Sequence, residues 1–235
     1  MAKLSNIRGM LLEESLLRLL ESSGYKTIEA PGVDPTLIDG PAGMKVKGRG
    51  GDHQIDAIAD FQIAQPFSHP QRLLVEAKCF DPQKNVGLPI VREAVGILKD
   101  VGEYWMVAGG EIPKQRYHYQ FALFSATGYT RDAQRYAFAQ DIFLIPLAAS
   151  RFFQNVIRSI RNIRPARLGA DENADIQVEM RDLRALVRRH VRETAPAEIP
   201  LEGAGESVDG LNDFIRSTRV TRTPKFRHKG REMLQ

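Results

Sequence analysis

The segment Arg72–Lys78 constrains the fold of this chain most, because its side chains alternate as they do in a β-strand. Successive strand residues point to opposite faces, so residues two positions apart share a face. The predicted faces are Leu74, Glu76 and Lys78 on one side, and Leu73, Val75, Ala77 and Cys79 on the other. An acidic and a basic side chain are thereby expected side by side on a strand that is otherwise mostly apolar.

Helix-like and strand-like segments alternate around this strand. Apolar residues recur at helical spacing in three segments, which are Leu4–Glu21, Leu88–Tyr104 and Thr130–Gln140. Further strands are expected at Tyr25–Ile28, Met44–Val46, Gln54–Ile63, Tyr119–Ala126 and Ile142–Leu147. A loop rich in Pro, Gly and Asp is expected from Pro31 to Gly43. This order predicts an α/β fold, a mixed β-sheet with helices on both faces.

The character of the sequence changes after residue 149. The remainder carries 17 of the 33 Lys and Arg residues but only 12 of the 29 Asp and Glu residues, so the net charge of +4 arises entirely there. We therefore predict a main domain over residues 1–149, a helical extension over 150–193, and a linker with a basic tail over 194–235. A basic excess favours polyanionic partners such as nucleic acid, although a solvated charged surface is the commoner cause of a charge run.

Two helices are expected in the extension. In Arg151–Ile163 the residues predicted to point inward are Phe152, Val156, Ile160 and Ile163, with Arg151, Arg158 and Arg161 opposite. In Asp175–Arg192 they are Ile176, Met180, Leu183, Val187 and Val191. The tail from Phe214 to Gln235 holds seven Lys and Arg residues with Glu232 as its acid. It either tracks a phosphate backbone or is simply solvated.

Several classes of protein are disfavoured by the sequence. Its apolar runs are a few residues long, too short to cross a bilayer, so no membrane role is expected. The N-terminus lacks the apolar core of a signal peptide. The single cysteine, Cys79, allows no internal disulfide. We expect a cytoplasmic protein.

Three chemically reactive side chains converge on the predicted sheet. Asp56 lies near the start of one strand, and Glu76 and Lys78 follow about 20 positions later at the end of the next. Adjacent strands can bring two carboxylates and one ammonium group to a single point. Mg²⁺ prefers oxygen ligands, and one or two carboxylates suffice to hold it. A bound metal lowers the pKa of its water and neutralises charge on phosphoryl oxygens, while a lysine can orient or help to deprotonate that water. The set predicts phosphodiester hydrolysis.

At these residues the sequence resembles the restriction-endonuclease-like nucleases, whose signature is an aspartate followed by (Asp/Glu)-x-Lys. It is more narrowly similar to the Mrr-type branch, on three further segments. They are the glycine-rich Gly48–Asp56, Leu12-Glu13 ahead of Gly24-Tyr25, and Ala126–Thr130 with the helix after it. The resemblance covers roughly residues 4 to 150.

The resemblance implies a restriction-endonuclease-like mixed sheet flanked by helices, and a role for each site residue. Asp56 and Glu76 would ligate Mg²⁺, for which Mn²⁺ would substitute, with the backbone carbonyl of Ala77 as a further ligand. Lys78 would act on the water, and Glu13 would be an accessory acid on the first helix. Glu14 competes with Glu13. The spacing favours Glu13, which falls on the predicted apolar face with Leu16, Leu17 and Leu20.

Other residues depart from the branch or carry two interpretations. Many Mrr-type members have Gln where Glu76 stands, and Arg92 occupies a helix position that often presents Gln; Arg92 could contact a phosphate. The Gly48–Gly51 segment is either a tight turn or, with Lys45, Lys47 and Arg49, a basic lip near DNA phosphates. Asp60 is expected to be a solvated strand residue.

The leading hypothesis is a Mg²⁺-dependent endonuclease that acts on DNA in restriction or defence. The helical extension would bind DNA, a partner subunit or a second copy of the chain. A homodimer is expected because a double-strand break needs two active sites. One alternative is a repair or junction-cleaving nuclease with the same chemistry. Another is a non-catalytic nucleic-acid-binding adaptor that has kept the fold.

Overall fold

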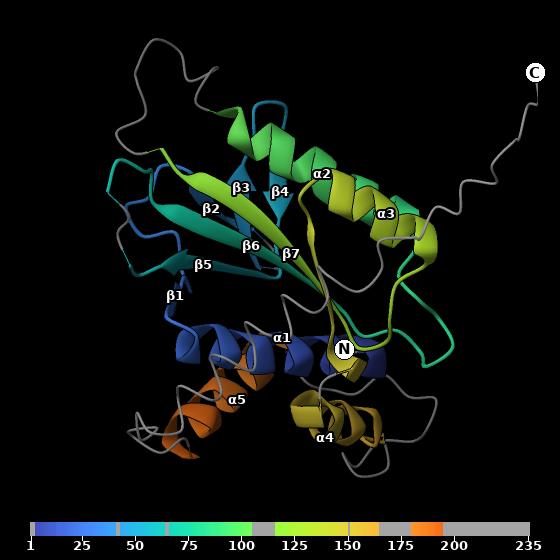
Figure 1. Ribbon diagram of the computed structural model, residues 1–235. Coiled ribbons are helices and arrows are strands. Elements are labelled where there is room, and N and C mark those ends of the chain that lie inside the picture. The colour runs from blue at the N-terminus through green and yellow to red at the C-terminus, as the bar shows by residue number, and fades with distance from the viewer. Residues whose placement is uncertain are drawn as a thin grey trace, which may run out of the picture. The chain divides into compact units, whose positions relative to one another are not determined.

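The computed structural model describes residues 3–40, 43–63, 66–104, 116–149, 151–164 and 180–194 (Figure 1). All of them belong to one compact unit, residues 1–197. Its α-helices are α1 (Leu4–Ser22), α2 (Leu88–Gly102), α3 (Arg131–Ala139), α4 (Arg151–Arg161) and α5 (Met180–Thr194). A 3-10 turn, η2 (Leu147–Ala149), leads into α4. Beyond Thr194, the predicted linker and basic tail lie outside the described residues.

The strands form two sheets. One has five strands in the order β1-β5-β6-β7-β8, namely β1 (Tyr25–Thr27), β5 (Ala57–Phe61), β6 (Gln71–Lys78), β7 (His118–Ser125) and β8 (Phe143–Pro146). Its β1–β5 and β5–β6 pairs are antiparallel, and its β6–β7 and β7–β8 pairs are parallel. The second sheet is an antiparallel array of β2 (Leu37–Gly40), β3 (Gly43–Lys47) and β4 (Asp52–Gln54).

Helices cover both faces of the five-stranded sheet, as predicted (Figure 1). One face is covered by α1, which contacts β5 and β6, with α4 and α5 packed on the outer side of α1. The other face carries α2 against β7 and α3 against β8. The core between these layers is aliphatic and aromatic; its fully buried members include Leu16, Ile58, Leu74, Phe121 and Leu123.

Local sequence explains where the helices begin and end. The N-cap of α3 is Thr130, whose hydroxyl accepts a hydrogen bond from the Ala133 amide at 3.3 Å. Pro89 lies in the first turn of α2, where a missing amide hydrogen costs nothing. After α1 the chain turns at Gly24, whose φ of +84° is a conformation that favours glycine.

Two sequence-based boundaries were wrong. The expected loop Pro31–Gly43 contains β2, whose Leu37 is buried and pairs with Val46. The density of Pro, Gly and Asp around it concealed a four-residue strand. The expected strand Gln54–Ile63 is divided into β4 and β5, because Gln54 pairs within the small sheet and Ala57 within the large one. Asp56 therefore lies in the break between the two sheets.

The inward face of α4 also differs from the prediction. The buried side chains are Phe153, Ile157 and Ile160, whereas Val156 and Ile163 are half-buried. Ile160 is buried as predicted, but Ile157 is buried in place of Val156, and the side chain of Phe152 lies outside the described set. α5 begins at Met180; the earlier part of its predicted range, with Ile176, is not among the described residues. Arg161, expected on the solvated face, instead donates to the carbonyl of Ala126 at 3.1 Å.

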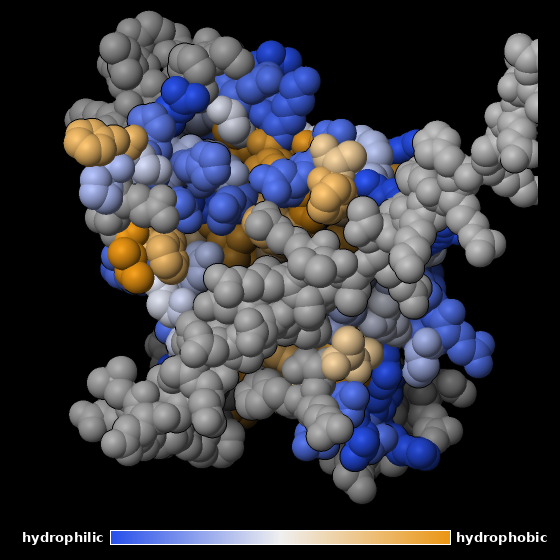
Figure 2. All heavy atoms as spheres, viewed as in Figure 1, coloured by the Kyte–Doolittle hydropathy of each residue, from blue (hydrophilic) through white to orange (hydrophobic). Residues whose placement is uncertain are grey.

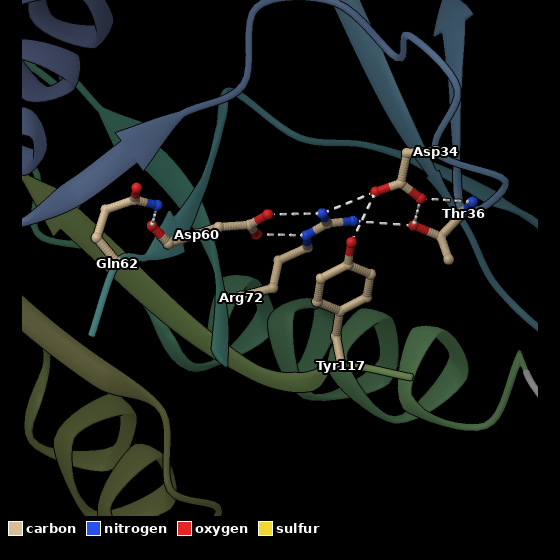
Figure 3. A network of polar contacts seen from close by, with 6 residues as sticks. All are labelled: Asp34, Thr36, Asp60, Gln62, Arg72 and Tyr117. Atoms are coloured by element: carbon tan, nitrogen blue, oxygen red, sulfur yellow. Dashed lines mark hydrogen bonds and ion pairs between the residues drawn. The ribbon is translucent and has the colours of Figure 1, made fainter. Parts of the chain in front are cut away.

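A network around Arg72 ties the start of β6 to the loop before β2 (Figure 3). The Arg72 side chain is 1% exposed and lies 2.7 Å from an Asp60 oxygen and 2.8 Å from an Asp34 oxygen. Its guanidinium also donates to the Thr36 hydroxyl and stacks 3.5 Å from the centroid of the Tyr117 ring. Asp60 is thus half-buried and paired, not solvated as the strand pattern suggested.

The surface seen in Figure 2 is mostly hydrophilic, with hydrophobic residues in small, separate patches. Among the described residues, the most exposed large hydrophobic side chains include Val33, Phe67 and Phe138. None of the described helices combines the length and apolar character that crossing a membrane requires.

Candidate active site

The carboxylate of Asp56 is directed toward the end of β6 by a backbone hydrogen bond. In the antiparallel β5–β6 pair, Ala57 lies opposite Val75, so the preceding Asp56 comes level with Glu76. Asp56 Oδ2 accepts a hydrogen bond from the Ala77 amide at 2.8 Å. The break between β4 and β5 frees this aspartate from a regular ladder and allows its side chain to turn toward the neighbouring strand.

Glu76 and Lys78 share a face of β6, as the alternation predicted. Lys78 Nζ contacts Glu76 Oε1 directly. The two side chains keep 21% and 27% of their surface exposed, so solvent reaches them. Together with the Asp56–Ala77 hydrogen bond, this contact brings the three predicted residues to one end of the large sheet.

The surroundings of Asp56 and Glu76 disfavour the charged forms of both carboxylates. Burial raises the pKa of Asp56, against the hydrogen bond from Ala77 and the charges of Lys78 and Arg184, which lower it. Burial also raises the pKa of Glu76, and the Asp56 charge raises it further. Removal from water therefore outweighs the partners that the protein provides for these two carboxylates.

Lys78 is held in its charged form. Burial alone would lower the pKa of its ammonium group, but the contact with Glu76 and the charges of Glu76, Asp56 and Glu93 outweigh burial and raise that pKa. In this state the side chain is a hydrogen-bond donor and a positive charge. Whether Lys78 orients the water or helps to deprotonate it, the two roles that the sequence left open, stays a prediction.

Helix α1 brings a third carboxylate to the same region. Burial raises the pKa of Glu13, and the second cause is repulsion from Asp56. The argument that placed Glu13 on the buried stripe was wrong, because the Glu14 side chain is the more buried, at 3% exposed against 16%. The leucines on either side hid the difference, since both glutamates border the apolar face. The accessory role of Glu13 stays a prediction, now supported by its electrostatic coupling to Asp56.

Two arginines of α5 contact these glutamates, and no pattern in the sequence indicates either contact. Arg184 donates to Glu13 Oε2 at 2.6 Å and to Glu14 Oε1 at 3.0 Å. Arg188 donates to Glu14 Oε2 at 2.7 Å. About 170 positions separate the partners, so only the packing of α5 on α1 reveals the pairing.

The donor set suits a hard cation held partly by water. Within the described part of the chain, no group of three or more His, Cys, Asp or Glu side chains is arranged to hold a metal. Asp56 and Glu76 provide two carboxylates, which is as many as Mg²⁺ usually takes from a protein. The residues therefore fit the predicted metal, while the part of the Ala77 carbonyl stays a prediction.

The glycine-rich segment predicted to lie near DNA phosphates has its contacts with α2 and not with the Asp56, Glu76 and Lys78 group. The Gly48–Gly51 turn packs on the end of α2, where Asp100 accepts from the Gly50 amide at 2.8 Å and contacts His53 at 2.7 Å. A Cβ on Gly48 would lie 2.7 Å from the backbone oxygen of Gly51, which cannot move aside as a side chain can, so glycine is favoured there. These contacts match the tight-turn interpretation.

The basic side chains predicted to contact DNA have partners of their own or remain untested. Arg49 pairs with Glu103 at 2.9 Å. The Arg92 guanidinium lies 5.8 Å from the centroid of the Tyr136 ring. Its neighbour Glu93 is the α2 residue whose charge raises the pKa of Glu76. Lys45 and Lys47 are half-buried on β3. Contacts of these four basic residues with DNA stay predictions.

Comparison with known proteins gives one family and several structural likenesses. The family model Mrr_cat, described as restriction endonuclease, matches residues 4–149. A search among curated proteins finds no match. Among solved structures, a protein of unknown function, AF1548, is 18% identical, with 88% of this chain and 98% of that chain covered at a TM-score of 0.45.

Two restriction enzymes are also similar in structure. The DNA modification-dependent restriction endonuclease AspBHI is 14% identical over 63% of this chain and 34% of its own, with a TM-score of 0.36. MspJI, solved with a 27-mer oligonucleotide, is 12% identical over 77% of this chain and 35% of its own, with a TM-score of 0.32. This chain thus covers about a third of each enzyme.

The family match spans α1 to η2, which includes both sheets and the Asp56, Glu76 and Lys78 group. The mixed sheet between helical layers is the restriction-endonuclease-like fold that the resemblance implied. The chain belongs to the Mrr_cat family of restriction endonucleases.

Proposed function

We propose that the protein is a Mg²⁺-dependent endonuclease that hydrolyses phosphodiester bonds of DNA, in restriction or defence. The observation that carries the proposal is the meeting of Asp56, Glu76 and Lys78 at one end of the large sheet. Burying two carboxylates beside one another lowers stability, so a protein without use for their charge would be better served by neutral residues. That cost argues against the non-catalytic adaptor.

Each residue has a part in this chemistry. Asp56 and Glu76 would hold the Mg²⁺ ion, which when bound would activate water and neutralise charge on the phosphoryl group. Asp56 is kept in place for this by the Ala77 amide. Mn²⁺ would substitute, since it accepts the same oxygen ligands.

Lys78 would act as a fixed donor. Its ammonium group is positioned by Glu76, on the same face of β6. From there it can donate a hydrogen bond to the attacking water or to a non-bridging phosphoryl oxygen, where negative charge builds up during attack. Glu13 would add a further carboxylate next to Asp56.

The decisive experiment compares the protein with its Lys78→Ala variant on supercoiled plasmid DNA in Mg²⁺, Mn²⁺ and excess chelator. We expect nicking by the unaltered protein, its loss in chelator, and a decrease of roughly 10²–10³-fold in the variant, as for loss of one fixed electrostatic donor. Lys26→Ala is the matched control, because Lys26 is an exposed lysine on edge strand β1 of the same sheet. Equal nicking by both variants, or none in either metal, contradicts the proposal.

The biological setting needs a separate comparison of substrates. Linear, nicked and four-way junction DNA are incubated with the protein under the same conditions. Preference for junctions would support the repair alternative over restriction. The chain's mass in solution, with and without DNA, tests the expected homodimer.

A further inference from the structure

Helix α5 lies outside residues 4–149, which the family model matches, yet it contacts the candidate active site. Arg184 reaches from α5 to Glu13 Oε2 at 2.6 Å. Its charge is also felt at Asp56, where it opposes the effect of burial. An element beyond the segment that the family model matches therefore contributes a cation to the carboxylate group.

The position of Arg184 is fixed by a second carboxylate that takes no part in this group. Glu14 is buried, and its two oxygens accept from Arg184 at 3.0 Å and from Arg188 at 2.7 Å. A buried carboxylate without partners is costly, so the Glu14 contacts hold α5 in one register on α1. Arg188 also pairs with Glu29, at a distance of 3.8 Å between Nη1 and Oε2. In this register the guanidinium of Arg184 bridges Glu14 and Glu13.

Glu13 needs such a partner to remain beside the group. The Glu13 side chain is only 16% exposed, and a carboxylate so far withdrawn from water is costly unless it has a partner. Arg184 provides the opposite charge at hydrogen-bond distance and a fixed direction, because the guanidinium is planar and already held by Glu14.

We propose that Arg184 is a positioning residue of the active centre, which holds the Glu13 carboxylate beside Asp56 and so makes α5 part of the nuclease. The inference rests on the proposed function for its catalytic consequence. Arg184 acts through Glu13: it orients the Glu13 carboxylate, and Glu13 is the residue next to the candidate metal ligand Asp56. Loss of such a residue typically costs about 10–100-fold in activity.

Arg188→Ala is a matched control for Arg184→Ala. Both substitutions remove one of the two cations from buried Glu14, so both reduce stability, but only Arg184 touches Glu13. Steady-state cleavage is measured below the unfolding temperature of each variant. We expect kcat to decrease about 10–100-fold in Arg184→Ala with KM for DNA unchanged, and to change less than about 3-fold in Arg188→Ala.

Two results would overturn the proposal. Equal losses of kcat in the two variants would show that α5 matters only for folding. A raised KM with unchanged kcat in Arg184→Ala would make Arg184 a DNA contact instead. Arg184→Lys retains a charge with a single donor group, so a kcat between those of the unaltered protein and Arg184→Ala is expected. Should Arg184→Ala not fold, this variant provides the comparison.

A double-mutant cycle tests whether Arg184 acts through Glu13. In a Glu13→Gln background, Arg184→Ala should lower kcat by less than about 2-fold, because the carboxylate that it positions is already gone. Full additivity of the two losses would contradict the proposal.

A crystal structure of each arginine variant provides a readout independent of cleavage. The Glu13 carboxylate should be displaced from Asp56 in Arg184→Ala and stay in place in Arg188→Ala. If the unaltered protein cleaves no DNA, the proposed function fails, while this structural comparison still decides whether Arg184 positions Glu13. An unmoved Glu13 in both variants would refute the positioning role even in an active nuclease.

Discussion

Arg72 and Arg184 each bridge two carboxylates, but they do so at the opposite ends of β6 and with opposite electrostatic results. Arg72, at the start of the strand, is 1% exposed and lies between Asp34 and Asp60. Arg184, beside the residues at the end of the strand, is 28% exposed and lies between Glu13 and Glu14. In the first network Asp34 accepts from Thr36 and Tyr117 and pairs with Arg72, and Asp60 accepts two hydrogen bonds from Arg72.

The pKa directions express this difference. Burial would raise the pKa of Asp34, but hydrogen bonds from Thr36 and Arg72 outweigh it and lower that pKa. At the other end the pKa values of Glu13, Asp56 and Glu76 are all raised, with burial as the first cause. Partners that stabilise the charged form thus outweigh burial at Asp34, whereas burial outweighs such partners at Glu13, Asp56 and Glu76.

The largest expected effect comes from removing the charge that closes the first network. Arg72→Met leaves Asp34 and Asp60 without their cation, and should lower the free energy of unfolding by about 3–5 kcal/mol in urea titrations. Arg135→Met, on the exposed face of α3, should change it by less than about 0.5 kcal/mol. At a temperature where the Arg72 variant is folded, its plasmid nicking should be near normal. A loss of nicking as large as that of Lys78→Ala would mean that the two ends do not act separately.

The sequence predicted the layered fold and the three central residues because both depend on local periodicity. Alternation along Arg72–Lys78 placed Glu76 and Lys78 on one face, and the apolar stripes gave α2 and α3 within a few residues. The break before β5 was missed, because Gln54 and Ala57 differ in their partner sheets and not in their local pattern. β2 was missed because four residues between turns give too short a pattern.

Contacts between distant segments were beyond the reach of such reasoning. Nothing near Arg72 indicates that Asp34 and Asp60 converge on it, and Asp60 alone looks like a solvated strand residue. The ordering of Glu13 and Glu14 failed for the same reason, since the burial of Glu14 depends on α5, about 170 positions away. Periodicity gives the face of an element, whereas packing decides which of two border residues is covered.

Replacing one aspartate near each end of β6 with asparagine should change the free energy of unfolding in opposite directions. Asp56→Asn removes a charge that burial disfavours, while its side-chain oxygen can still accept from Ala77, so the metal-free protein should gain on the order of 1 kcal/mol in its free energy of unfolding. Asp34→Asn removes a carboxylate that Arg72 stabilises, and should lose a similar amount. Only the Asp56 variant should lose Mg²⁺-dependent cleavage. Destabilisation by both substitutions would show that the charge at Asp56 is compensated after all.

The smallest expected effect is the pH dependence of the changes in free energy of unfolding that Asp56→Asn and Asp34→Asn cause, measured without metal. A carboxyl group whose pKa is raised by folding contributes to stability below its ordinary value, 3.8 for aspartate, and loses that contribution as the pH rises through the folded pKa. The advantage of Asp56→Asn should therefore shrink as the pH falls from neutral toward 3.8, because a protonated Asp56 resembles asparagine. Asp34 has a lowered pKa, so its contribution is complete above 3.8 and disappears only below that value. The deficit of Asp34→Asn should accordingly stay constant over the same interval.

Urea titrations of the unaltered protein and the two variants at several pH values measure both trends. The difference in free energy of unfolding between each variant and the unaltered protein is expected to change by less than about 1 kcal/mol over this interval. Parallel curves for the two variants would show that the ends of the strand do not differ in charge compensation, and that the carboxylates near Lys78 have no unmet demand for a cation.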